Sequence, residues 1–274
     1  MNPNFKFQNE VLRNIQSIGA DPQIKNLSLQ WLYGTLKHHY SYNFSFLGRP
    51  IIQYPQDIVA IQELIWEIKP DLIIETGIAH GGSLIMSASM LALLDYCEAV
   101  KNGEVFDPRF TNRRVLGIDL DIRDHNRTAI EAHPMSHRID MIQGSSIDID
   151  IISHVYDIAK NHERVLVCLD SNHTHEHVLS ELEAYGPLVS MESYCCVFDS
   201  IIEDLPEGTC IDRQWDKGNN PKTAVWEYLS RLNDKDCKGA DGTRLAFKID
   251  RSIETKLLIT VAPDGYLKRV TYQE

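Results

Sequence analysis

The sequence is short of positive charge: 27 lysines and arginines stand against 39 aspartates and glutamates, which gives a net charge of −12. Proteins that bind a nucleic-acid backbone depend on clustered lysine and arginine side chains, so we expect no nucleic-acid partner. Hydrophobic residues make up 43% of the 274 residues, enough to bury a core and too many for a disordered chain. The composition favours a globular protein that acts on a small molecule.

Signals for export, membrane insertion and disulfide formation are also missing. The first residues, MNPNFKFQNEV, contain no basic region followed by an apolar run. The most apolar stretch, LIMSASMLALL, is too short to cross a bilayer. Six cysteines show no CxxC spacing, so we interpret them as reduced thiols. These absences predict a cytoplasmic protein with no membrane contact.

From residue 71 onwards, short β-rich runs alternate with helical patterns. Five apolar runs, separated by four amphipathic stretches, span residues 71–76, 113–120, 138–144, 164–170 and 194–200. This alternation predicts an α/β fold with a Rossmann-like, doubly wound, mostly parallel sheet covered by helices on both faces. After a predicted helix at 223–232, the runs LAFKID, KLLITVA and YLKRV predict an antiparallel end of the sheet.

The first 55 residues predict a helical extension that precedes this α/β domain. Asp21-Pro22 is typical of a helix start, and the apolar spacing after it predicts a helix over 23–40. We therefore divide the chain into an N-terminal helical extension, 1–55, and a domain at 56–274. The apolar stripes of the extension favour a homo-oligomer, although they could equally pack onto the chain's own sheet.

The first strand of the predicted sheet ends in ETGIAHGGS, from Glu75 to Ser83. In doubly wound sheets the ligand lies beyond the carboxyl ends of the strands. Glycines there allow a tight turn and a close approach of the backbone to a ligand, and an acidic residue suits a cofactor with an amino group. The spacing departs from G-x-G-x-x-G and lacks the lysine of a P-loop. The alternative is a glycine-rich turn that holds no ligand.

The next two strands end in polar residues that suit a nucleotide. Asp119 can accept hydrogen bonds from the hydroxyls of a ribose, unless it is only a helix cap or a solvated aspartate. Gly144, Ser145 and Ser146 follow the third strand, where amides and hydroxyls could hold an adenine edge.

The fourth and fifth strands end in Asp170 and Asp199. Carboxylates at neighbouring strand ends face the same crevice and suit Mg²⁺ or another hard cation. Buried as a bare pair they would repel each other, so a cation or a hydrogen-bond network should offset the repulsion. The alternative is that each caps the helix that follows. The run CLDSNHTHEHV adds three histidines, but a helix from Thr174 would point His175 and His177 in different directions, which excludes a shared zinc ion.

Three stretches, IIETGIAHGGSL, LDSNHTHEHVLSELEAYGPLVS and GNNPKTAVWEYL with APDGYLKRV, resemble the cephalosporin hydroxylase / rhamnosyl O-methyltransferase family. The resemblance covers residues 50 to 272 and implies the class I S-adenosylmethionine-dependent methyltransferase fold. It implies transfer of a methyl group from S-adenosylmethionine to a hydroxyl of a sugar or another small polar molecule. The domain at 56–274 would then bind the cofactor, and the loops at 40–55 and 202–222 would shape the pocket for the acceptor.

The resemblance also implies roles for particular residues. The methionine part of the cofactor is expected at Glu75, Gly77, Ala79, Gly81 and Ser83, with Asp170 close by. The ribose is expected at Asp119, and the adenine at Gly144, Ser145 and Ser146.

The expected metal site departs from the family pattern, because members usually carry Glu-Asp where this sequence has Phe198-Asp199-Ser200. Asp170 and Asp199 could still bind Mg²⁺ if the Ser200 hydroxyl or extra waters complete the shell, or the protein could work without metal. His173 occupies the position of the general-base lysine of catechol-type enzymes. The predicted mechanism is in-line displacement by an acceptor oxygen, deprotonated by His173 or activated by a cation at Asp170 and Asp199.

Two alternatives stay open at this point. The missing carboxylate at Phe198 is compatible with a catalytically silent cofactor-binding subunit of a biosynthetic complex. A hydroxylase is less favoured, since no H-x-D or H-x-E pair is present to begin an iron facial triad.

Overall fold

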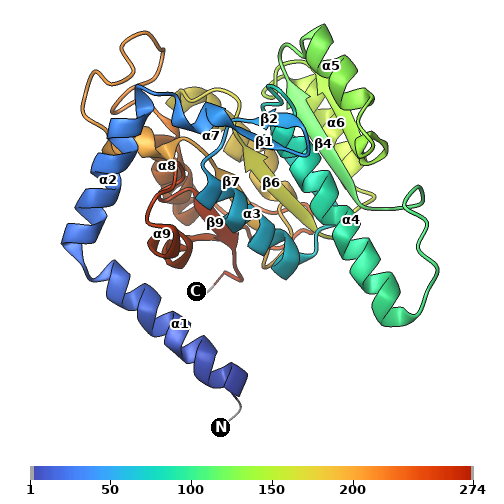
Figure 1. Ribbon diagram of the computed structural model, residues 1–274. Helices are drawn as coiled ribbons and strands as arrows, with labels where there is room; N and C mark the ends of the chain where they lie inside the picture. The colour runs from blue at the N-terminus through green and yellow to red at the C-terminus, as the bar shows by residue number, and fades with distance from the viewer. Residues whose placement is uncertain (1–2, 273–274) are drawn as a thin grey trace.

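A computed structural model describes residues 3–272 and shows a seven-stranded sheet between two layers of helices (Figure 1). The strands are, in spatial order, β5 (Ile139–Gln143), β4 (Arg114–Asp119), β3 (Leu72–Thr76), β6 (Val165–Leu169), β7 (Tyr194–Val197), β9 (Tyr266–Arg269) and β8 (Phe247–Ile249). The first five run parallel, and β9 is antiparallel to both β7 and β8. The predicted doubly wound sheet with an antiparallel C-terminal pair is confirmed.

The central strands are buried on both faces, which explains their continuous apolar runs. In β3, Ile73 packs into one core cluster, whereas Leu72 and Ile74 pack into the other. The first cluster is closed by α3 (Pro55–Ile68), α4 (Gly82–Asn102), α5 (Asp124–Glu131) and α9 (Arg251–Leu257). The second is closed by α6 (Ile149–Ala159), α7 (His175–Tyr185) and α8 (Pro221–Asp234).

The helix α4 is longer than its most apolar stretch suggested. It has 21 residues and, by length and composition alone, is apolar enough to cross a membrane, but half of its most apolar window is buried within the fold. Its buried residues, among them Leu84, Ile85 and Leu91, belong to the core cluster on one face of the sheet. Core helices of globular domains have this character.

The C-terminal run KLLITVA does not form the predicted strand. Residues up to Leu257 belong to α9, and no strand follows before Tyr266. Asp250 begins this helix, because its side chain accepts hydrogen bonds from the backbone N–H and the hydroxyl of Ser252. Only Lys256 and Leu257 of the run are helical. Farther along, the backbone N–H of Val261 donates to the Asp57 side chain and that of Ala262 to the Thr260 hydroxyl, so these amides pair with side chains and not with a neighbouring strand.

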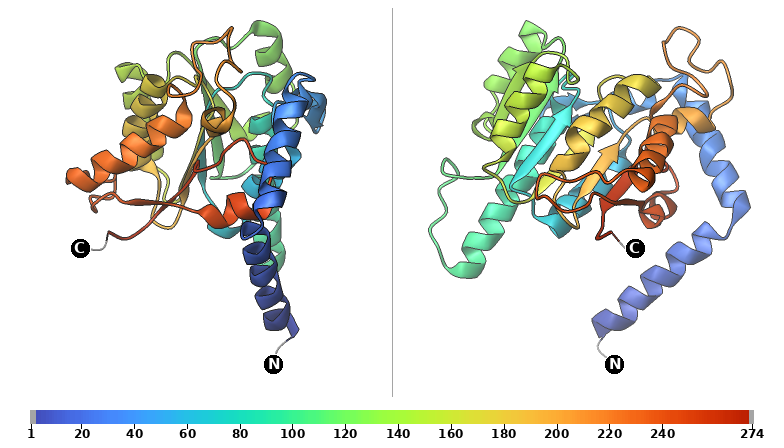
Figure 2. Two further views of the ribbon diagram at one scale, coloured as in Figure 1. Left: turned by 90° about the vertical axis from the view of Figure 1, so that its left-hand side faces the viewer. Right: turned by 180° about the vertical axis from the view of Figure 1, so that it is seen from behind.

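The N-terminal region contains α1 (Pro3–Gly19) and α2 (Pro22–Leu36), followed by η1 (Tyr40–Asn43) and a hairpin of β1 (Phe44–Phe46) with β2 (Arg49–Ile51). Figure 2 shows α1 extending away from the sheet. Farther along, Leu32, Ile51 and Tyr54 are buried in the same core cluster as α3 and α4. The hairpin and α2 thus pack against the sheet domain, and the division at residue 55 stays a prediction.

All six cysteines are free thiols, as the sequence predicted. Cys168, Cys195 and Cys196 lie buried in β6 and β7 and pack as small apolar side chains.

Candidate active site

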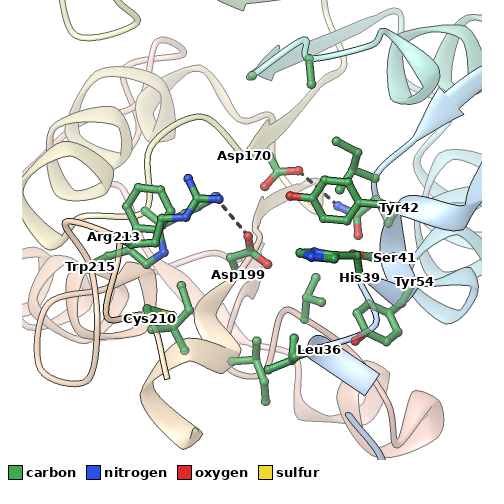
Figure 3. Close-up of a pocket in the computed structure, with 18 of the residues that line it drawn as sticks. Leu36, His39, Ser41, Tyr42, Tyr54, Asp170, Asp199, Cys210, Arg213 and Trp215 are labelled. Carbon is green, nitrogen blue, oxygen red and sulfur yellow. Dashed lines mark hydrogen bonds and ion pairs between the residues drawn. The ribbon is translucent and has the colours of Figure 1, made fainter. Parts of the chain in front are cut away.

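A pocket of about 600 Å³ opens at the carboxyl ends of β3, β6 and β7. Its floor includes Gly77, Asp170 and Asp199, which follow these three strands. In Figure 3 His39, Tyr42 and Tyr54 lie to one side of the two aspartates, with Arg213 and Trp215 to the other. The loops at 40–55 and 202–222 therefore line the pocket, as predicted.

The turn after β3 is shaped by glycine. Gly77 has a φ of 89°, and a Cβ at this position would lie 2.1 Å from the carbonyl oxygen of Asp170. Only glycine allows the β3 turn and the β6 strand end to approach this closely. Gly82, at the start of α4, would likewise place a Cβ 2.2 Å from the carbonyl oxygen of Pro50. The sequence thus brings the segment after β2 directly over the start of α4.

Glu75 lies under this turn and is almost completely buried, at 4% exposure. The Ser83 hydroxyl donates a hydrogen bond to its Oε1 atom. Burial raises the pKa of Glu75 from 4.5 to about 7, and the Ser83 hydrogen bond only partly opposes this rise. A cationic group brought next to Glu75 would lower that pKa again and restore the carboxylate.

The turn also receives a contact from the end of β4. The Asp119 Oδ2 atom accepts hydrogen bonds from the backbone N–H groups of Ile78 and Ala79, at 2.8 and 3.1 Å. Its Oδ1 atom accepts from the N–H of Asp121 at 3.1 Å. Asp119 therefore fixes the β3 turn in addition to any contact with a ligand, a role that the sequence pattern did not reveal.

Asp170 and Asp199 lie close together with His173, and one ligand atom from each of the three lies within 4.8 Å of the other two. Burial and the negative charges of Asp199 and Glu75 raise the pKa of Asp170 well above its usual range. The Nε2 atom of His173 lies 3.1 Å from Oδ2 of Asp199, and the His173 ring meets the Trp215 ring edge-on. The arrangement can accept a proton or hold a divalent cation.

Ser200 and Phe198 contribute no ligand atom to this cluster. Ser200 is fully buried, and its hydroxyl donates to the carbonyl oxygen of Pro263 at 2.6 Å. Phe198 packs in the core next to Glu75 and Asp170. Asp199 adopts a left-handed backbone conformation with a φ of 54°, so its side chain and that of Ser200 point in different directions. The expected Ser200 ligand is therefore corrected: the third side chain at the cluster is His173.

Gln53 is a pocket residue that the sequence reading did not single out. Its Nε2 atom donates to Oδ2 of Asp170 at 3.3 Å. Gln53 belongs to the segment between β2 and α3. In the sequence, the aromatic residues near this segment were the only sign that it could form a wall of the pocket.

The other two histidines make separate contacts. His175 lies between Thr223 and Glu227 of α8, at 2.8 and 2.9 Å. The Nε2 atom of His177 lies 3.1 Å from the hydroxyls of both Ser146 and Ser171. The two imidazoles therefore contact different residues and share no partner.

The structure also corrects the expected role of Ser146, whose side chain is 5% exposed and turned away from the pocket. Its hydroxyl donates to Oε1 of Glu181 at 2.6 Å. The expectation that Gly144 and Ser145 border the adenine stays a prediction.

Fold and site together define a class of enzyme: a doubly wound sheet with a buried acid under a glycine turn, and with carboxylates at the following strand ends, is typical of class I S-adenosylmethionine-dependent methyltransferases. Within that class, the chain belongs to the Rhamnosyl O-methyltransferase/CmcI family, which matches residues 38–270.

Similar proteins agree with this assignment. The chain is 26% identical over 245 residues to the Rhamnosyl O-methyltransferase of Mycobacterium bovis, which covers 88% of this chain and 82% of that protein. The Mycobacterium leprae Rhamnosyl O-methyltransferase is 24% identical over 178 residues, 65% of this chain and 68% of that protein. The solved structure "CmcI-N160 apo-structure" shares the fold, with a TM-score of 0.51 at 16% identity over 84% of this chain and 78% of that chain. The predicted S-adenosylmethionine-dependent O-methyltransferase is thereby confirmed.

Proposed function

We propose that this enzyme methylates a hydroxyl group of a sugar or of a sugar-bearing small molecule. The observation that carries the proposal is the placement of Asp170, His173 and Asp199 in the same pocket as the Gly77 turn. Proton-accepting groups there lie beside the turn that would hold the methyl donor. The Rhamnosyl O-methyltransferase relatives support a sugar as the acceptor.

The residues around the β3 turn fit the methionine part of S-adenosylmethionine. Glu75 offers a buried carboxylate for the α-ammonium group, and Ser83 orients that carboxylate. Gly77, Ala79 and Gly81 provide a turn without bulky side chains, in which a Cβ at Gly77 would meet the neighbouring strand end. S-adenosylmethionine, when bound, supplies a methyl group on a sulfonium, which is a good leaving group and requires no covalent enzyme intermediate.

The rest of the cofactor would extend towards β4 and β5. Asp119 would accept from the ribose hydroxyls with the lone pairs that its backbone donors leave free. Gly144 and Ser145 would border the adenine at the end of β5.

His173 is the proposed general base. The Nε2 atom of His173 lies 3.1 Å from Oδ2 of Asp199, so the carboxylate favours the proton on Nε2 and would leave the Nδ1 lone pair free. The imidazole can then take the proton of the acceptor hydroxyl, and Asp199 stabilises the resulting imidazolium. General-base assistance of this kind contributes about 10²- to 10⁴-fold to the rate. The protein's remaining task is alignment of acceptor oxygen, methyl group and sulfur.

Mg²⁺ fits the two carboxylates of Asp170 and Asp199, which repel each other and have no lysine or arginine partner among the ion pairs of residues 3–272. Waters would fill the positions that Phe198 and Ser200 leave open, since Mg²⁺ retains several waters in proteins. When bound, the ion would supply charge neutralisation and polarisation of the acceptor oxygen.

A labelled-methyl assay over a panel of sugar and polyol acceptors tests the proposal. We expect O-methylated product from acceptors with a sugar ring, and the loss of product in Asp199→Asn. Binding of S-adenosylmethionine without transfer to any hydroxyl would instead support a catalytically silent cofactor-binding subunit.

We also propose that the protein forms a homo-oligomer through its N-terminal helices. Phe5, Phe7 and Leu12 of α1 are 59%, 66% and 57% exposed, and Trp31 of α2 is 38% exposed. Packing against a second copy would remove this apolar surface from water. Light scattering on the purified protein should show more than one chain per particle, and the variant Phe7→Lys/Leu12→Lys should shift it towards the monomer.

A further inference from the structure

Glu181 and His177 of α7 form a buried cluster behind the active-site pocket that the mechanism does not use. Glu181 is fully buried, and its Oε1 atom accepts hydrogen bonds from the hydroxyls of Ser146 and Ser171, each at 2.6 Å. Ser146 follows β5, and Ser171 follows β6. A single carboxylate oxygen therefore connects two loops that come from strands on either side of β4 and β3.

The direction of the hydrogen bonds to Glu181 follows from its chemistry, because a carboxylate oxygen accepts. Each serine hydroxyl has one proton, and both protons go to Glu181. Nε2 of His177 lies 3.1 Å from each hydroxyl, and in the tautomer with a proton on Nε2 it would share that proton between the two serine oxygens. Each serine is held from two sides, so neither loop can shift without breaking two hydrogen bonds.

A role in stability alone does not account for this cluster. The second oxygen of Glu181, Oε2, is buried and has no hydrogen-bond partner among residues 3–272. A buried carboxylate with an unsatisfied oxygen is destabilising, whereas a leucine at the same place would bury well. The carboxylate does, however, constrain the distance between the two loops, because its Oε1 atom accepts a hydrogen bond from one hydroxyl of each.

The two loops border the cofactor in the placement proposed above. Gly144 and Ser145 immediately precede Ser146, and Ser171 lines the pocket next to Asp170. The Tyr185 hydroxyl adds a third tether from α7, because it donates to the carbonyl oxygen of Ser146 at 2.5 Å. In that placement the adenine end of the cofactor would lie against this pair of loops.

We infer that Glu181, through Ser146 and Ser171, holds the adenine-binding loops at the spacing the cofactor requires, and so governs S-adenosylmethionine affinity without touching cofactor or acceptor. This inference rests on the proposed placement of the adenine. Glu181 is thus a positioning residue. Loss of the Glu181 side chain should weaken binding of the adenine end specifically. Glu75 and the His173–Asp199 pair make their own contacts and do not depend on Glu181 for their positions.

The variant Glu181→Leu removes the shared acceptor, and calorimetry with S-adenosylmethionine and with adenosine measures the effect. We expect both dissociation constants to rise by the same factor, at least about tenfold, with kcat at saturating cofactor within about twofold of the unchanged protein. Glu181→Gln keeps an acceptor oxygen of the same reach and should restore binding to within about threefold. Hydrogen exchange of the amides at 144–147 should accelerate in Glu181→Leu and not in Glu181→Gln.

His175→Ala is the matched control, because His175 lies on the same helix and contacts α8 instead. It should leave cofactor affinity unchanged. If Glu181→Leu fails to fold, Ser171→Ala removes one tether and should still weaken both ligands.

Unchanged affinity in Glu181→Leu or Ser171→Ala, or a fall in kcat at constant affinity, would overturn the inference and leave the proposed function intact. Failure of the unsubstituted protein to bind S-adenosylmethionine would overturn both.

Discussion

Replacing Glu75 with glutamine should remove a loss of stability that develops as the pH rises. Burial raises the pKa of Glu75 from 4.5 to about 7, so the folded protein keeps a proton that the unfolded chain has released. The contribution of this group to stability is therefore fully present below pH 4.5 and is lost as the pH rises through about 7. A rise from 4.5 to about 7 corresponds to roughly 3 kcal/mol of unfolding free energy.

Urea unfolding of the cofactor-free protein and of Glu75→Gln at several pH values between about 5 and 8 measures this contribution of Glu75 to the unfolding free energy. Asp57, whose pKa burial raises to about 6, titrates in both proteins, so its contribution cancels in the difference between their unfolding free energies. As the pH rises over this range, we expect the unfolding free energy of the variant to increase by roughly 2 to 3 kcal/mol relative to that of the unsubstituted protein. Part of the gain arises through Asp170, whose pKa the Glu75 charge also raises.

A difference between the two proteins that does not change with pH would refute burial as the cause of the raised pKa. Addition of S-adenosylmethionine supplies a second check. Its ammonium group should favour the Glu75 carboxylate, so cofactor affinity of the unsubstituted protein should increase as the pH rises through about 7 and that of Glu75→Gln should not.

Three further predictions concern the other parts of the site. His173→Ala should lower kcat by about 10²- to 10⁴-fold while calorimetry shows unchanged cofactor affinity; a kcat near that of the unsubstituted protein would exclude His173 as the base. Phe198→Glu should supply the oxygen ligand usual in the family and tighten Mg²⁺ binding in calorimetry, and equal Mg²⁺ affinity in both proteins would argue against an ion at Asp170 and Asp199. Gly77→Ala should lower the melting temperature and weaken cofactor binding, because its Cβ would lie 2.1 Å from a carbonyl oxygen; a variant as stable as the parent would contradict that close approach.

The strands of the parallel sheet could be predicted from the sequence because burial on both faces leaves long apolar runs. The run predicted at 71–76 corresponds to β3, Leu72–Thr76, and the run at 164–170 to β6, Val165–Leu169. The strand predicted for KLLITVA was wrong, since composition does not reveal that α9 extends to Leu257 or that the Val261 amide donates to the distant Asp57 side chain.

Some residues of the site could be predicted from the sequence, and the directions of others could not. Topology alone brings Asp170 and Asp199 together, because neighbouring parallel strands end at the same edge of the sheet. The directions of Ser146 and Ser200 depend on partners far away in the sequence, Glu181 and Pro263, and no local pattern records them. For the same reason, the cluster of Glu181 and His177 could not be recognised before the loops were placed in space.

Transfer of a labelled methyl group from S-adenosylmethionine to a sugar acceptor, with the product examined by NMR, tests the central claim most directly. The account predicts a new O-methyl signal on one sugar hydroxyl, formed in step with S-adenosylhomocysteine and abolished in Asp199→Asn. Methyl transfer to nitrogen or carbon, or cofactor binding with no transfer to any sugar hydroxyl, would contradict it.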